Sequence, residues 1–119
     1  MLQNRPNIIW SGDYNICHRP IDIHDPISNK KSSGFLPEER AWMDKFTSSG
    51  FDDSFRVLYP ELAHKYTWWT YRANARANNK GWRIDYHMTT TPLKDRIKEA
   101  SIMHDVHHSD HCPILVDID

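Results

Sequence analysis

The sequence predicts an α/β fold in which a mixed, largely antiparallel sheet carries helices on one face. Short segments rich in β-branched and aromatic residues recur along the chain, and one longer segment repeats apolar residues at helical spacing. Strands interspersed with one clear helix favour a sheet covered on one side. A length of 119 residues leaves room for one domain with a modest core, which we expect to span residues 1–119.

The first elements follow from local composition. Residues 7–10 form an expected buried strand that ends at Gly12 and leads into a polar cluster. Residues 18–34 are rich in Pro, Asp, Ser, Asn and Lys without periodicity, which is typical of a long surface loop. Pro37 with two acids behind it predicts a helix start, and apolar residues at helical spacing extend that helix to Gly50.

The second part of the chain contains most of the expected strands. Aromatic and β-branched residues 66–71 predict a strand. Alternation over residues 82–88 predicts another, paired antiparallel with 68–71. The other expected elements are a short helical or extended segment at 51–57, helical turns at 92–96, and strands at 97–103 and 114–118.

Composition excludes some classes of protein. No apolar run approaches the roughly 18 residues of a membrane span, and no signal peptide is visible. Two cysteines do not make a disulfide framework, so we expect a reducing cytoplasm. A net charge of -1 gives no bulk attraction to nucleic acid, and any DNA contact therefore requires a local basic patch.

Three polar clusters are expected at strand edges, namely Asp13 with Asn15, Asp85 alone, and Asp110 with His111. Taken singly, each has an ordinary interpretation as a turn former, a surface residue or part of a structural salt bridge. Together they predict a hydrolytic site. Carboxylates bind a hard cation such as Mg²⁺, and an imidazole oriented by a buried aspartate stabilises a phosphoryl group or moves a proton.

Two further groups of residues have alternative interpretations. Arg72, Arg76, Lys80 and Arg83 surround the second aromatic strand and predict contacts to a phosphate backbone, or else only a solvated loop. The histidine-rich segment 104–108 resembles a metal cluster by composition. Its spacing matches no zinc site, so we expect a solvated loop there.

Five ordered motifs extend over nearly the whole chain. They are Gly12-Asp13-Tyr14-Asn15, Gly34-Phe35-Leu36-Pro37-Glu38-Glu39-Arg40, Tyr66-Thr67-Trp68-Trp69, Gly81-Trp82-Arg83-Ile84-Asp85-Tyr86 and Ser109-Asp110-His111-Cys112-Pro113. In these motifs the chain resembles the C-terminal half of the exonuclease III family of apurinic/apyrimidinic endonucleases, within the endonuclease/exonuclease/phosphatase superfamily.

The resemblance implies roles for individual catalytic residues. Asp13 would activate or position the attacking water, and Asn15 would hold the scissile phosphate. His111 would bind the phosphate and stabilise its growing charge, with Asp85 orienting the imidazole. The implied metal is Mg²⁺, with Mn²⁺ as the alternative, held around Asp13, Asn15, Asp110 and His111.

The same resemblance implies a DNA-binding surface and a reaction. Trp68, Trp82 and Ile84 would wall the pocket for an extruded baseless sugar, and Arg72, Arg76 and Arg83 would contact the DNA. The substrates would be double-stranded DNA with abasic sites or 3′ ends, cut as an abasic-site endonuclease and a 3′-to-5′ exonuclease. The alternative is a non-catalytic nucleic-acid-binding half.

Length is the main departure from the family. Its members are about twice this size, and their first half supplies an Asn and a Glu for the metal and a Tyr for the phosphate. We therefore expect this chain to need the missing N-terminal half as a partner, to expose an apolar sheet face where that half packs, and to have little activity alone. No membrane partner is expected.

Overall fold

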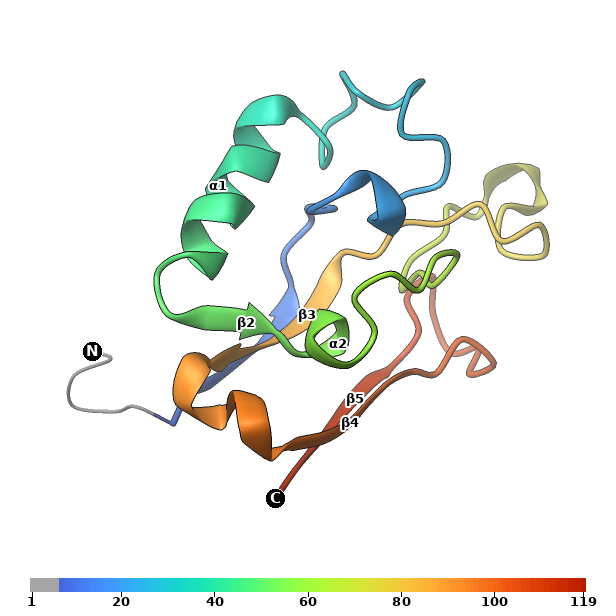
Figure 1. Ribbon diagram of the computed structural model, residues 1–119. Coiled ribbons are helices and arrows are strands. Elements are labelled where there is room, and N and C mark those ends of the chain that lie inside the picture. Colours follow the sequence, from blue (N-terminus) through green and yellow to red (C-terminus); the bar gives the residue numbers. More distant parts are fainter. Residues whose placement is uncertain (1–6) are drawn as a thin grey trace.

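Two antiparallel β-ladders form the frame of the computed structural model, which describes residues 7–119 (Figure 1). In the first ladder, β3 (Asp85–Thr90) lies between β1 (Ile9–Asp13) and β2 (Phe51–Asp53). In the second, β4 (Ile97–Ile102) pairs with β5 (Ile114–Ile118). The expected class, a mixed α/β fold with antiparallel strands, is confirmed, although the strands form two ladders instead of one sheet.

The helix α1 (Pro37–Thr47) begins where the sequence predicted. Proline occupies its first turn, and the Glu39 carboxylate accepts hydrogen bonds from the backbone N–H groups of Gly34 and Leu36, which fixes the entry of the chain. Its buried Met43 packs on apolar side chains of β2 and β3. The helix ends at Thr47, before Gly50, and the hydroxyls of Ser48 and Ser49 bond to carbonyls of its last turn.

Four short helical elements join the strands. The segment α2 (Ser54–Leu58) contacts both β3 and β4, and so lies between the two ladders (Figure 1). The other three are the 3₁₀ turns η1 (Pro20–Asp22), η2 (Arg72–Asn74) and η3 (Thr91–Arg96). The expectations for 51–57, 92–96, 97–103 and 114–118 are therefore met by β2 with α2, η3, β4 and β5.

The expected strand over 66–71 is wrong. This segment forms only isolated bridges, in which Trp68 pairs with Trp82 and with His111. The predicted pairing of 82–88 with 68–71 is correspondingly reduced to one bridge, and β3 pairs with β1 and β2 instead. The reason is local, because the N–H groups of Ile84 and Asp85 bond to the Thr67 hydroxyl and so leave the strand-to-strand ladder.

The first strand is also displaced from its expected position at 7–10. Gly12 lies inside β1 and does not end it, with a φ of 148° that L-residues rarely adopt. As a result Asp13 is a strand residue, paired in register with Asp85 of β3. The sequence had placed Asp13 in the polar cluster after the strand.

The segment 18–34 is anchored more firmly than a surface loop. It contains η1, and Asp22 and Ile23 are both buried. By contrast all five residues of β1 are exposed, including Trp10, and Leu115 of β5 is exposed as well. Among the described residues no helix is long and apolar enough to cross a membrane.

Candidate active site

Two carboxylates meet at one end of the β1–β3 ladder. Asp13 is the last residue of β1, Asp85 is the first of β3, and the two are cross-strand partners. Opposed side chains in an antiparallel pair project from the same face, where two negative charges repel each other. The arrangement therefore favours a cationic or hydrogen-bonding group between them.

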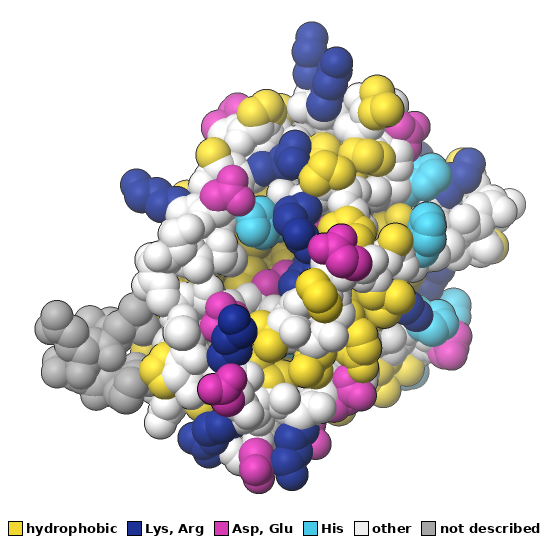
Figure 2. Space-filling model, viewed as in Figure 1, with side chains coloured by type: hydrophobic (Ala, Val, Ile, Leu, Met, Phe, Trp, Pro, Cys, Tyr) yellow, Lys and Arg dark blue, Asp and Glu magenta, His cyan; other side chains and the backbone are white. Residues whose placement is uncertain are grey.

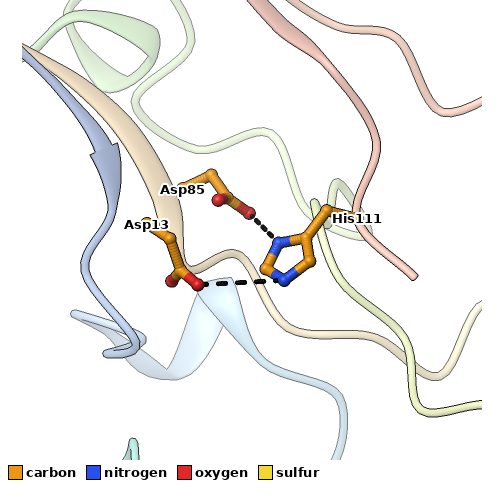
Figure 3. Close-up of side chains that lie close together, drawn as sticks. All are labelled: Asp13, Asp85 and His111. Carbon is orange, nitrogen blue, oxygen red and sulfur yellow. Dashed lines mark hydrogen bonds and ion pairs between the residues drawn. The ribbon is translucent and has the colours of Figure 1, made fainter. Parts of the chain in front are cut away.

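The imidazole of His111 provides that group (Figure 3). Its Nδ1 lies 2.9 Å from Asp85 Oδ2, a hydrogen bond in which the ring nitrogen donates. Its Nε2 faces Asp13 Oδ2 across 3.8 Å, which is too long for a direct hydrogen bond. Asp85 therefore fixes the orientation of the ring, and Nε2 makes no direct hydrogen bond to Asp13.

The electrostatics follow from this geometry. Burial raises the pKa of the Asp85 carboxyl above its ordinary value, although hydrogen bonds with His111 and Thr67 oppose the rise. Desolvation lowers the pKa of His111, but the hydrogen bond to Asp85 and the charges of Asp85, Asp13 and Asp110 outweigh it and raise that pKa. More of the ring is consequently cationic at neutral pH than in a free histidine, which suits an anionic ligand.

Thr67 holds the two sides of the site together and was not identified from the sequence. It is fully buried, and its hydroxyl accepts from the backbone N–H groups of Ile84, at 3.0 Å, and Asp85, at 3.2 Å. Its carbonyl accepts from Cys112 N–H, next to His111. One residue thus ties the start of β3 to the segment that carries the histidine. A buried threonine between aromatic residues gave no sequence signal for this role.

Asn15 and Asp110 lie at the margins of this group. Asn15 has a left-handed backbone with φ of 57°, and its N–H donates to Asp13 Oδ1, which closes a turn and fixes that carboxylate. Asp110 Oδ2 accepts from Trp68 Nε1 at 3.0 Å, and its Oδ1 lies 4.0 Å from His111 Nε2. The proposed metal and phosphate roles of Asn15 and Asp110 stay predictions.

The three residues predicted to form a sugar pocket are gathered together. Trp68 and Trp82 meet edge to face with ring centroids 5.9 Å apart, and both pack on the core cluster that contains the buried Ile84. The Trp68 indole also bonds to Asp110, so this aromatic wall is joined directly to the residue beside His111. Whether it accepts a sugar stays a prediction.

The expected basic surface is mostly used inside the protein. Arg83 is fully buried, and its guanidinium is paired with Asp22 and Asp53, so the prediction that it contacts DNA is wrong. Arg76 donates to the carbonyls of Ser109, His104 and Val106 and stacks on Trp69. Only Arg72 and Lys80 are left exposed.

Basic side chains do not gather on the face drawn in Figure 2, where they alternate with acidic and apolar ones. Of the four basic residues predicted to contact a phosphate backbone, Arg72 and Lys80 are the exposed ones.

The donor set fits a magnesium ion only in part. Asp13, Asp85 and His111 are the one group of three potential ligands found among residues 7–119, with ligand atoms within 4.8 Å of one another. Asp85 is already bonded to His111, whereas Asp13 is exposed and its Oδ2 makes no direct hydrogen bond to the ring. Mg²⁺ commonly binds through one or two carboxylates together with water and substrate phosphate. Asp13 is therefore the residue best placed to hold it. The histidine-rich segment 104–108 supplies no such group.

The comparisons with known proteins agree with the fold and the motifs. Residues 1–111 match the model of the Endonuclease/Exonuclease/phosphatase family. The chain belongs to this family. The exodeoxyribonuclease of Bacillus subtilis is 46% identical over 113 residues, covering 95% of this chain and 45% of that protein. The DNA repair nuclease APEX1 of Danio rerio is 43% identical over 115 residues, covering 97% of this chain and 37% of that protein.

Solved members of the Endonuclease/Exonuclease/phosphatase family share the architecture. The structure of an AP endonuclease from Archaeoglobus fulgidus matches with a TM-score of 0.90 at 29% identity, over 99% of this chain and 49% of that one. The predicted resemblance to exonuclease III-type enzymes is thus confirmed. The chain spans less than half the length of these three relatives.

Proposed function

We propose that this chain supplies one wall of the active site of a Mg²⁺-dependent DNA-repair nuclease that cuts phosphodiesters at abasic sites and at 3′ ends. One observation carries the proposal, namely that His111 is oriented by Asp85 and that its Nε2 lies 3.8 Å from Asp13 Oδ2, too far for a direct hydrogen bond. Relatives named exodeoxyribonuclease, DNA repair nuclease and DNA-(apurinic or apyrimidinic site) endonuclease support the substrate class.

The chemistry of the proposed site follows from its three side chains. A phosphoryl oxygen placed beside the ring would accept a hydrogen bond from His111 Nε2–H, and the raised pKa of His111 keeps that proton available. Asp85 keeps the ring fixed through Nδ1, so the donor is positioned before the substrate arrives. Asp13, whose Oδ2 lies 3.8 Å from Nε2, would position the attacking water.

A Mg²⁺ ion at Asp13 would neutralise charge on the phosphoryl oxygens. Trp68, Trp82 and Ile84 would form the apolar wall against which a sugar without a base rests. We place the protein in a reducing, cytoplasmic setting, consistent with Cys17 and Cys112, which are both unpaired and buried.

We propose that residues 7–119 supply one side of a phosphodiesterase site, because Asp13 is the only carboxylate of their ligand group not already bonded to the histidine. We therefore propose that turnover needs further ligands from the part of the fold that the relatives have and this chain does not match. The second candidate function, binding of abasic DNA without cleavage, follows from the same observation.

The test is incision of a duplex with one abasic site in Mg²⁺, by the chain alone and mixed with the N-terminal part of the Bacillus relative. We expect little incision by the chain alone and clear incision 5′ to the abasic site by the mixture. In the mixture, His111→Ala should slow incision by about a hundredfold or more.

The controls separate the two candidate functions. His104→Ala, an exposed histidine in the loop before β5, should leave the rate unchanged. Preferential binding of the abasic duplex without incision in either sample would favour the non-catalytic function. Equal binding of abasic and undamaged duplex, again without incision, would count against both.

A further inference from the structure

A second pair of polar side chains follows the two catalytic candidates along the same strands. Ser11 of β1 and His87 of β3 are cross-strand partners, one step along the ladder from Asp13 and Asp85. Because alternate residues of a strand project from the same face, all four side chains share one face of the β1–β3 ladder. Sequence reasoning gave this pair no role.

This second pair is bonded to the strand that follows His111. His87 Nε2 lies 3.0 Å from the carbonyl oxygen of Ile114, the first residue of β5. A carbonyl only accepts, so Nε2 carries the proton. Nδ1 then accepts from the Ser11 hydroxyl, at 2.6 Å. The chain Ser11–His87–Ile114 thus links both strands of the first ladder to the start of the second.

The link is well placed to set the position of His111. Only two residues separate Ile114 from His111, and one of them is Pro113, whose ring fixes a backbone angle. The segment is therefore held against β3 in two places. The His111 ring bonds to Asp85 (Figure 3), and the Ile114 carbonyl bonds to His87.

We propose that Ser11 and His87 are positioning residues that hold His111 in register over Asp13 and Asp85. The effect of this positioning on catalysis rests on the proposed function, whereas the positioning itself does not. Asp85 accepts from Nδ1 of His111 and so favours the Nδ1–H form of the neutral ring, whereas an unconstrained imidazole favours Nε2–H. The ratio of these two forms is therefore a direct measure of the position of His111.

The experiment is nitrogen-resolved NMR of the His111 ring in the whole chain, at a pH where the ring is neutral. His87→Phe removes both bonds and keeps an aromatic ring, and Ser11→Ala removes one. We expect the ratio of Nδ1–H to Nε2–H at His111 to fall about fivefold in His87→Phe and about twofold in Ser11→Ala, in line with the loss of ordinary hydrogen bonds.

Rescue and control variants distinguish positioning from general loss of structure. His87→Gln keeps a donor and an acceptor and should restore most of the ratio, and His104→Phe in the exposed loop should leave it unchanged. An unchanged ratio in a folded His87→Phe overturns the proposal. If that variant does not fold, Ser11→Ala decides, and an unchanged ratio there overturns it equally.

The activity assay is read separately. If the ratio responds as expected but the mixture with the N-terminal part never cuts DNA, the proposed function fails and the positioning holds. If the mixture cuts DNA and the ratio does not respond, only the positioning fails.

Discussion

Arg83 is the largest of the fully buried side chains among the described residues, and its replacement by Met tests whether its charge belongs to the core. The guanidinium donates to Asp22 through Nε at 2.8 Å and to Asp53 through Nη1 at 3.1 Å, with a second contact to Asp53 from Nη2. Asp22 and Asp53 are themselves buried. Methionine keeps much of the volume but leaves these carboxylates without their shared partner.

The expected cost follows from which carboxylate is left unpaired. Removing one member of a buried ion pair costs about 3–5 kcal/mol. Asp22 retains Arg56, 2.6 Å away, so most of the loss falls on Asp53. We therefore expect Arg83→Met to lower the free energy of unfolding by about 3 kcal/mol, at the lower end of that range. Domains of this kind have only about 5–15 kcal/mol in total.

Urea unfolding followed by tryptophan fluorescence measures this loss, because the chain has five tryptophans. The matched control is Arg72→Met, an exposed arginine that should change stability by less than about 0.5 kcal/mol. The double variant Arg83→Met with Asp53→Asn should recover about 1–2 kcal/mol, since the unpaired charge is removed. A loss below about 1 kcal/mol for Arg83→Met would refute the reasoning, because a buried ion pair cannot be broken so cheaply.

Other predictions concern pH, backbone strain and thiol reactivity. Burial raises the pKa of Asp22, but its ion pairs, led by Arg83, outweigh burial and hold that pKa below its ordinary value. The stability that Asp22 contributes is therefore complete above its unfolded pKa of about 3.9 and is lost as the pH falls through its folded pKa. At pH values below about 4, the urea concentration at the unfolding midpoint should therefore decrease, and Asp22→Asn should remove most of that decrease. Gly34 has a φ of 97°, and an added Cβ would lie 2.8 Å from an indole carbon of Trp82. Gly34→Ala should therefore lower the free energy of unfolding by about 2 kcal/mol in the same urea assay. An unchanged midpoint would contradict this prediction. Burial raises the pKa of the Cys112 thiol to about 11. At pH 8 this thiol should therefore react with a thiol reagent at least about a hundredfold more slowly in the native chain than in urea. Equal rates would show that the thiol is accessible.

Much of the candidate site was accessible from motif order alone. Asp13, Asp85 and His111 were expected to act together, and the structure brings their ligand atoms within 4.8 Å of one another. The expected orientation of His111 by Asp85 corresponds to a 2.9 Å hydrogen bond. These residues can be identified from the sequence because the chemistry constrains their residue type and because each lies at a turn or at the end of a strand.

The errors have a common physical origin. The aromatic segment 66–71 has high strand propensity, yet the Thr67 hydroxyl takes the N–H groups that a ladder would use. Arg83 was predicted to contact DNA because it lies in a basic stretch, yet it forms ion pairs with two buried carboxylates from other elements. Strand propensity and local charge do not indicate which distant groups bond to a given hydrogen-bond donor.

The sequence by itself determined the fold class, the helix beginning at Pro37, the closing strands and the identity of the three central polar residues. These depend on periodicity, capping and residue chemistry, which are local properties. Only the tertiary structure decided that Asp13 and Asp85 oppose each other in register, that Arg83 is internal, and that Ser11 and His87 bind the start of β5. Each of these depends on pairing between segments far apart in the chain, where a one-residue change of register would turn every side chain to the opposite face.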